Sequence, residues 1–518
     1  MCERGRPLLV GKPYFTYKPI KRGVKDACRG VRPTDSTPSL GKPSTWGSGW
    51  QLRNLSKETC SLFNEGQGLS YKRKENIPNM RTGIDRVAEK ARMGKEEIFT
   101  SLAHHITPEL LKESLKKIPK ASGVGVDAQS VEEAKRQFET WSTEMISTIH
   151  RKGYKPPPSR RAYIPKIGKK EMRPIAMPTV KDKALQKATV EVLNAIYEQD
   201  FLKCSFGGRP GRSAHQAVAT LSTFISTKKV NWICEVDLKN FFGSLDHQWA
   251  LKFLMHRVRD PRIITLIRRW LKTGVMENGE QNHTEIGTSQ GSPISVLLSN
   301  IYLHYVLDLW IEEVVKKRMR GEMYQIRYID DFVVCFQYHS DAIRFQKALE
   351  KRLSKFSLEI EPSKTRLIEF GRFAEKGRKL KGKRVETFYF LGFTWYCSKT
   401  RNGGFKVGMK TEKKRLQRGY SKITALLKEI RHHKLKEQKE AINRVLRGHY
   451  RYYGVGGNWK ALNRIYFKAV KTWRKTLSSR SQKGKLRWEK FNKILGSFPL
   501  EKPKLSIPYT RIISLAIL

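Results

Sequence analysis

Two adjacent aspartates, Asp330 and Asp331, lie where two β-rich runs of the sequence meet. Residues 325–328 precede the pair, and residues 332–336 follow it. A carboxylate between strands loses several kcal/mol of hydration free energy unless it is paired or bound to a metal ion. The two acids are therefore expected either to lie in an exposed turn or to hold cations. The turn is the weaker alternative, because Ile329 is poorly suited to the positive φ of a tight hairpin.

A third carboxylate, Asp237, follows the apolar run Trp232–Val236. If this strand pairs beside the hairpin, the carboxylates of Asp237 and Asp330 share one oxygen-rich pocket. Oxygen ligands of this kind select Mg²⁺, with Mn²⁺ as a possible substitute. Glu235 is expected on the opposite face of the strand and is not counted as a ligand.

Two such ions, about 3.5–4 Å apart, stabilise the attacking and leaving oxygens of an in-line phosphoryl displacement. One ion activates a primer 3′-hydroxyl and the other neutralises a nucleoside triphosphate, which is the chemistry of a polymerase. The sequence thus predicts a two-metal site with the catalytic residues Asp237, Asp330 and Asp331 and the metal-binding residues Asp237, Leu238, Asp330 and Asp331.

The charge of the chain predicts a polyanionic partner. Lys and Arg total 102 against 48 Asp and Glu, which gives a formal net charge of +54, far beyond what solubility requires. A ribosomal or chromatin-like binding protein is the alternative to an enzyme. The 23 Phe, 19 Tyr and 11 Trp argue for a folded enzyme core, and aromatic rings among cations also suit base stacking.

Cysteine usage and hydropathy indicate the compartment. The seven cysteines are scattered and never spaced as Cys-x-x-Cys, which favours a reducing, cytoplasmic environment and argues against a structural zinc site. The most apolar stretch, residues 294–315, is interrupted by polar side chains and predicts a core helix. The N-terminus has no apolar segment of the signal-peptide kind.

The elements that must position the aspartates follow an α+β pattern. Between residues 154 and 370, short strand-like runs and helical segments occur in the order of a split βαβ layer. After a strand-like run at 388–395 the chain becomes helical and basic, with 28 Lys or Arg against 5 Asp or Glu in residues 401–500. Three apolar series predict three amphipathic helices there.

Several sequence blocks resemble those of the reverse transcriptases encoded by bacterial group II introns, the intron maturases. They lie at 173–178, 205–213, 237–242 and 287–295, and at 328–331, where the sequence is Tyr-Ile-Asp-Asp. The resemblance implies RNA-directed DNA synthesis by a right-hand polymerase. Its predicted parts are a basic, mostly disordered leader (1–80), an N-terminal extension and fingers (81–230), a palm (231–400), an all-α basic thumb or maturase bundle (401–497) and a short tail (498–518).

The resemblance also implies roles for single residues. Those expected to bind the incoming nucleotide are Lys166 and Arg173 as a triphosphate clamp, Phe241 as a steric gate against ribose, Gln290 near the new base pair, and Lys364. Those expected to bind nucleic acid are Arg161, Arg209, Arg212 and Arg447. From the residues alone, Lys166 and Arg173 could equally form a solvated basic patch. Phe241 could equally be an ordinary aromatic residue of the core. Gly208 stands where a bulkier residue is usual.

The implied partners are an RNA template, in particular group II intron RNA, a DNA primer and deoxynucleoside triphosphates. Ile329 departs from the Ala of most intron-encoded relatives and is familiar from free-standing relatives linked to DNA repair. A repair polymerase is therefore one alternative. A non-enzymatic splicing cofactor is another, although it predicts lost catalytic acids. The tail has neither Cys nor His, so no endonuclease is expected.

Overall fold

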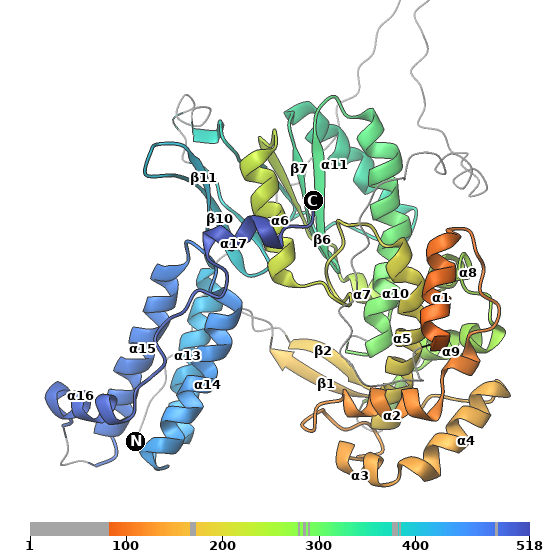
Figure 1. The fold of residues 1–518 in the computed structure, drawn as a ribbon, viewed down its shortest axis with the longest axis horizontal. Helices are drawn as coiled ribbons and strands as arrows, with labels where there is room; N and C mark the ends of the chain where they lie inside the picture. The colour runs from red at the N-terminus through yellow and green to blue at the C-terminus, as the bar shows by residue number, and fades with distance from the viewer. Residues whose placement is uncertain are drawn as a thin grey trace, which may run out of the picture. The chain divides into compact units, whose positions relative to one another are not determined.

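The computed structural model describes residues 82–518 apart from 166–171, 278–279, 283–285, 289–290, 376–381, 383–384 and 482–484 (Figure 1). The predicted leader and the predicted nucleotide ligands Lys166 and Gln290 lie outside these residues. The described fold is mixed α+β, as the sequence predicted, and its strands form three sheets within the described ranges.

The central sheet has the strand order β6-β7-β3-β8, and each neighbouring pair is antiparallel. Its strands are β3 (Trp232–Val236), β6 (Met323–Tyr328), β7 (Asp331–Phe336) and β8 (Arg366–Glu369). Because β7 lies between β3 and β6, the helical connection from β3 to β6 must pass over it. This is the split βαβ arrangement that the sequence predicted.

Helices supply two of the three connections between the strands of this sheet, and the third, from β6 to β7, is a tight turn. The connection from β3 to β6 contains α7 (Phe241–Ser244), α8 (His247–Met255), α9 (Pro261–Lys272), α10 (Pro293–Leu303), the π-helical turns η3 (His304–Asp308) and η4 (Ile311–Val315), and the 3₁₀ turn η5 (Lys316–Arg318). The connection from β7 to β8 contains α11 (His339–Ser354).

The continuous helical stretch Pro293–Arg318 is long and apolar enough to span a membrane. However, 78% of its apolar window is buried inside the protein, as predicted for a core helix.

An α-helical layer precedes the central sheet in sequence. It contains α1 (Thr82–Met93), η2 (Ala103–His105), α2 (Pro108–Lys116), α3 (Val131–Arg136), α4 (Phe138–His150) and α5 (Val180–Asp200). Helix α2 begins at Pro108, because the Thr107 side chain accepts from the Leu110 N–H at 3.3 Å and proline suits the first turn of a helix. Helix α5 packs against α1, α2 and α10, so this layer shares one apolar core with the sheet.

A second sheet has the order β2-β1-β4-β5, with β1 (Ser159–Pro165), β2 (Met172–Met177), β4 (Val275–Glu277) and β5 (Glu280–Asn282). A third has the order β11-β10-β9, with β9 (Phe388–Phe390), β10 (Phe393–Lys399) and β11 (Phe405–Thr411). The expectation that the chain is wholly helical after residue 401 was wrong, because β11 pairs along the whole of β10. Helix α6 (Ala214–Thr227) packs against β6 and β11.

The three predicted amphipathic helices are present as α13 (Lys413–Glu429), α14 (Leu435–Tyr453) and α15 (Trp459–Ser478). They share an apolar core that includes Ile423, Leu446 and Trp473. The chain ends with α16 (Trp488–Ser497) and α17 (Tyr509–Leu515), and α17 packs against α6 (Figure 1).

Candidate active site

The aspartate pair lies at a tight turn between β6 and β7. Tyr328 pairs with Asp331 across the ladder, which leaves Ile329 and Asp330 as the two-residue connection. Ile329 has a φ of 60°, in the left-handed region. The argument that Ile329 disfavours a tight turn was therefore wrong for this chain. A β-branched residue in this conformation costs on the order of 1–3 kcal/mol and persists only where its surroundings enforce it.

Strand β3 brings the third aspartate to the same edge. It runs antiparallel to β7, and its last pair is Val236 with Phe332. In an antiparallel pair, the residue after Val236 lies opposite the residue before Phe332, so Asp237 lies beside Asp331. The main chain of Asp237 is held by the Glu361 N–H, which donates to its carbonyl oxygen at 2.8 Å. Pairing of three separate strands thus gathers the three predicted catalytic residues.

These carboxylates repel one another. Burial raises the pKa of Asp331 to about 8, and the charges of Asp330, Asp237 and Glu235 add to this effect. Burial also raises the pKa of Asp330, with a further contribution from Asp237, while Arg173 and Arg327 oppose the rise. The edge of the sheet is therefore short of positive charge, which suits a bound cation.

Glu235 does not face away from this group, and the prediction that it does was wrong. Residues two apart on a strand share a face, so Glu235 lies on the same face as Asp237. It is nevertheless not available as a ligand. Arg366 holds its carboxylate at 2.6 Å, and the Tyr389 N–H donates to it at 3.3 Å.

Two predicted nucleotide-binding cations lie close to the aspartates. The Lys364 ammonium forms an ion pair with the Asp237 carboxylate, and its side chain is 55% exposed. Arg173, on the exposed part of β2, is near enough to Asp330 to lower the pKa of that carboxyl. Both positions agree with a role beside a bound triphosphate, although Lys364 is paired with a predicted metal ligand here.

The donors at this edge are all oxygens, and their mutual repulsion fits a hard divalent ion. Among the described residues, no group of three His, Cys, Asp or Glu side chains is gathered tightly enough to hold a metal ion in the present arrangement. Leu238 could contribute only its carbonyl oxygen, because its side chain is apolar and 5% exposed. The chemistry of these residues, rather than their present spacing, therefore fits such an ion.

Comparison with known proteins agrees with this geometry. Residues 164–395 match the family model described as reverse transcriptase (RNA-dependent DNA polymerase). These residues form a reverse transcriptase domain. The domain contains Asp237, Asp330 and Asp331 together with β2, the central sheet, β9 and the first three residues of β10.

Several proteins of known name are similar to part of this chain. The group II intron-encoded protein LtrA of Lactococcus lactis is 32% identical over 231 residues, which are 44% of this chain and 38% of that protein. Protein YkfC of Escherichia coli is 28% identical over 311 residues, 54% of this chain and 77% of YkfC. The mitochondrial nuclear intron maturase 2 of Arabidopsis thaliana is 31% identical over 108 residues. The chain thus spans well under half the length of LtrA.

Arg209 of the reverse transcriptase domain is not placed to bind nucleic acid, contrary to the prediction. Its side chain is buried, and it forms an ion pair with Glu198 at 3.0 Å. It also donates to the carbonyl oxygens of Leu202 and Ser205, each at 2.8 Å. The sequence could not separate this structural arginine from Arg212, which is only half-buried and whose buried Nη1 has no hydrogen-bond partner among the described residues.

Gly208 has a structural explanation. Its φ is +71°, and a Cβ atom there would lie 2.2 Å from Cγ1 of Val296. The bulkier residue that is usual at this position therefore does not fit the present loop.

The remaining predicted residues have mixed surroundings. Phe241 is 2% exposed, and its ring packs edge-on against Phe242. This agrees with the core alternative and leaves the steric gate a prediction. The Nε of Arg161 lies 3.6 Å from Glu277. Arg447 is about half exposed and forms an ion pair with Glu501 at 3.1 Å, so neither arginine is wholly available to a nucleic acid.

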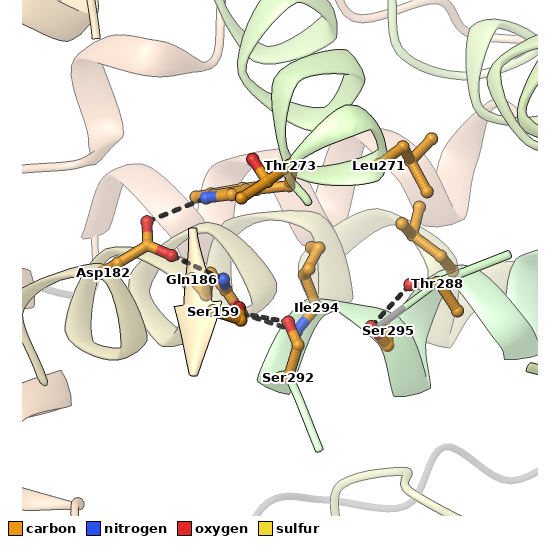
Figure 2. A pocket seen from close by; sticks show the side chains of 11 residues that line it. Ser159, Asp182, Gln186, Leu271, Thr273, Thr288, Ser292, Ile294 and Ser295 are labelled. Carbon is orange, nitrogen blue, oxygen red and sulfur yellow. Dashed lines mark hydrogen bonds between the residues drawn. The ribbon is translucent and has the colours of Figure 1, made fainter. Parts of the chain in front are cut away.

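Sequence reasoning missed a buried anchor of the loop that leads to α10 (Figure 2). Asp182 of α5 accepts from Tyr154 at 3.0 Å, Trp270 at 2.8 Å and Gln186 at 2.9 Å. Gln186 in turn accepts from the Ser292 hydroxyl. The side chains of Asp182, Gln186, Trp270 and Ser292 border a cavity of about 10 Å³, the lower limit for one water molecule. Asp182 stands in an unremarkable helical segment, so only its burial identifies it.

Proposed function

We propose that the chain is an RNA-directed DNA polymerase that copies an RNA template by two-metal phosphoryl transfer. The proposal depends on one observation: Asp237, Asp330 and Asp331 meet at one edge of the central sheet, inside the reverse transcriptase domain. A non-enzymatic splicing cofactor that only bound RNA would have no use for three mutually repelling carboxylates at this edge.

In this proposal Asp237, Asp330, Asp331 and the Leu238 carbonyl hold the ions. Mg²⁺, or Mn²⁺ as a substitute, supplies the Lewis acidity that activates the primer hydroxyl and neutralises the leaving pyrophosphate. The hairpin aims the two adjacent carboxylates, and β3 supplies the third. Asp331 must be ionised to act as a ligand, although burial raises its pKa.

The neighbouring cations then act on the incoming nucleotide. Lys364, whose ammonium pairs with Asp237 in this structure, would turn to the triphosphate when the nucleotide binds. Arg173 remains beside Asp330 and binds the same phosphates through its planar fork of donors. Lys364 and Arg173 thereby contribute positive charge at the sheet edge both before and after nucleotide binding.

The proposed architecture is that of a right hand. The sheet that contains the β1–β2 hairpin is the fingers, the central sheet is the palm, and α13 to α15 are the thumb. The thumb helices carry many cations and few acids, as suits a phosphate backbone.

The natural template is proposed to be group II intron RNA, bound also during splicing. The names of LtrA and of the Arabidopsis maturase support this, as does the net charge of +54. Ile329, in the catalytic turn, favours a second candidate, a free-standing reverse transcriptase that extends annealed DNA ends. Comparing extension of short annealed DNA ends with splicing of a group II intron transcript by the same preparation would distinguish the two.

Primer extension on an RNA template with Mg²⁺ tests the activity. We expect wild type to synthesise DNA and Asp330→Asn to lose synthesis while remaining folded. Asp85→Asn, an exposed change in the first turn of α1, is the matched control and should retain full synthesis. Synthesis by Asp330→Asn at the wild-type rate would exclude the proposed mechanism.

A further inference from the structure

Arg327 is a fully buried arginine three residues before the catalytic pair, at 0% exposure. Its partner is Asp308, also at 0% exposure, with contacts of 2.9 and 3.1 Å from Nε and 2.5 Å from Nη2. Asp308 belongs to the π-helical turn η3, and it also accepts from Gln325 at 2.9 Å. The ion pair thus joins the helical connection between β3 and β6 to strand β6 itself.

The other N–H groups of the Arg327 guanidinium also donate hydrogen bonds. Nη1 donates to the carbonyl oxygen of Ile329 and to the Asn300 side chain, both at 2.9 Å, and Nη2 donates to the Ser205 hydroxyl at 2.9 Å. All five N–H donors of an arginine fork therefore have an acceptor. One of these acceptors is the main chain of the strained turn itself.

The same arginine organises the loop that lies against the turn. Asn300 donates to the Gly207 carbonyl at 2.8 Å, and the main chain of Arg327 pairs with Cys204 and Phe206. Gly207 lies so close that a Cβ atom there would be 2.6 Å from the nitrogen of Ile329. The turn is thus confined by Gly207 and held by the Arg327 guanidinium.

We propose that Arg327, fixed by Asp308, is a positioning residue that holds Ile329 in its left-handed conformation and thereby aims the Asp330 and Asp331 carboxylates at the metal ions. The Ile329 carbonyl belongs to the peptide that leads into Asp330, so fixing this oxygen fixes the direction of the acid. Lysine would keep the charge but could not reach Asp308, Asn300, Ser205 and Ile329 together. This proposal rests on the proposed function.

The test compares Arg327→Lys with Arg257→Lys. Arg257 is an equally buried arginine, paired with Asp200 at 3.0 Å and bonded to the carbonyls of Gly94 and Ala91, which lie in and just after α1. The readouts are Mn²⁺ affinity, followed by electron paramagnetic resonance, and the kcat and KM of primer extension.

We expect Arg327→Lys to weaken Mn²⁺ binding and lower kcat by about tenfold each, as for residues that orient metal ligands, with KM for the nucleotide changed by less than about twofold. Arg257→Lys should stay within about twofold of wild type in all three. Equal behaviour of the two variants would overturn the proposal. An inactive wild type whose Mn²⁺ binding still weakens in Arg327→Lys would instead exclude the polymerase and retain the positioning role.

Asn300→Ala and Ile329→Gly test the same role of Arg327 independently. If Arg327→Lys does not fold, Asn300→Ala removes one link to the turn while leaving the Arg327–Asp308 ion pair, and it should weaken Mn²⁺ binding in the same direction. Glycine tolerates a positive φ, so in an Ile329→Gly background the kcat effect of Arg327→Lys should shrink to about threefold or less. An undiminished effect in that background would exclude the role in holding Ile329.

Discussion

The aspartate edge of the central sheet and the helices α13 to α15 both depend on charge, but they use it in opposite ways. At the edge, a few half-buried or buried charges each have named partners, such as Lys364 with Asp237 and Arg327 with Asp308. In the helices, cations are numerous, and α15 contains six Lys or Arg and no acidic residue. Each charge at the edge therefore has its own partner, whereas the cations on the helices can replace one another. Single substitutions should therefore change activity or stability much more at the edge than on the helices.

The largest effect is expected at the edge. Asp331→Asn should lower kcat for primer extension by at least about a hundredfold, because it removes a direct metal ligand rather than a supporting contact. The melting temperature should not fall, because the substitution removes a carboxylate whose charge is destabilised by burial and by Asp330. If Asp331→Asn kept a tenth or more of the wild-type kcat, single charges at the edge would not be specific in the way that distinguishes the edge from the helices.

The next largest effects are expected at Arg209 and Arg212, two arginines of one loop, and they should differ in kind. Arg209→Ala should lower the free energy of unfolding by about 2–4 kcal/mol, because it leaves Glu198 and two carbonyl oxygens without their donor. Arg212→Ala should change stability by less, because this side chain is only partly buried and its buried Nη1 already lacks a hydrogen-bond partner among the described residues. It should weaken RNA binding, because the exposed part of the guanidinium is the part that can contact a phosphate. Chemical denaturation and filter binding measure both, and the reverse pattern would restore the original prediction for Arg209.

These arginines mark the limit of what the sequence predicts. Pattern and spacing located β3, the two strands of the catalytic hairpin and all three bundle helices, because apolar periodicity reports burial directly. They could not tell which arginine of a Gly-rich loop turns inward, because that depends on Glu198, eleven residues away. They also failed at Ile329, where tertiary contacts override the local preference, and at β11, whose partner β10 supplies the ladder.

A pH effect is expected from the buried Asp182. Burial raises the pKa of this carboxyl from 3.8 to about 6, so the folded state binds more protons than the unfolded state between these values. Stability contributed by this group is full below pH 3.8 and is lost as the pH rises through about 6. Asp182→Asn should flatten the melting temperature between pH 4.5 and 6.5 relative to wild type. Parallel curves for the two proteins would show that Asp182 is ionised in both states.

The smallest effect is expected on the helices. Lys468→Gln in α15 removes one exposed cation of many, and it should reduce RNA affinity by no more than about threefold. The slope of log Kd against log salt should fall by about 0.7–0.9 if Lys468 neutralises one phosphate. Binding titrations at several salt concentrations measure this. A loss of affinity comparable to that of Arg212→Ala would show that charge on α15 is specific after all.

The most direct test of the account is a count of Mn²⁺ ions bound with a primed RNA template and a nucleotide. Electron paramagnetic resonance should find about two ions on wild type and fewer on both Asp237→Asn and Asp330→Asn, since these residues from separate strands are held to share one site. Asp85→Asn should match wild type. Undiminished Mn²⁺ binding by either active-site variant would contradict the claim that the three aspartates act together.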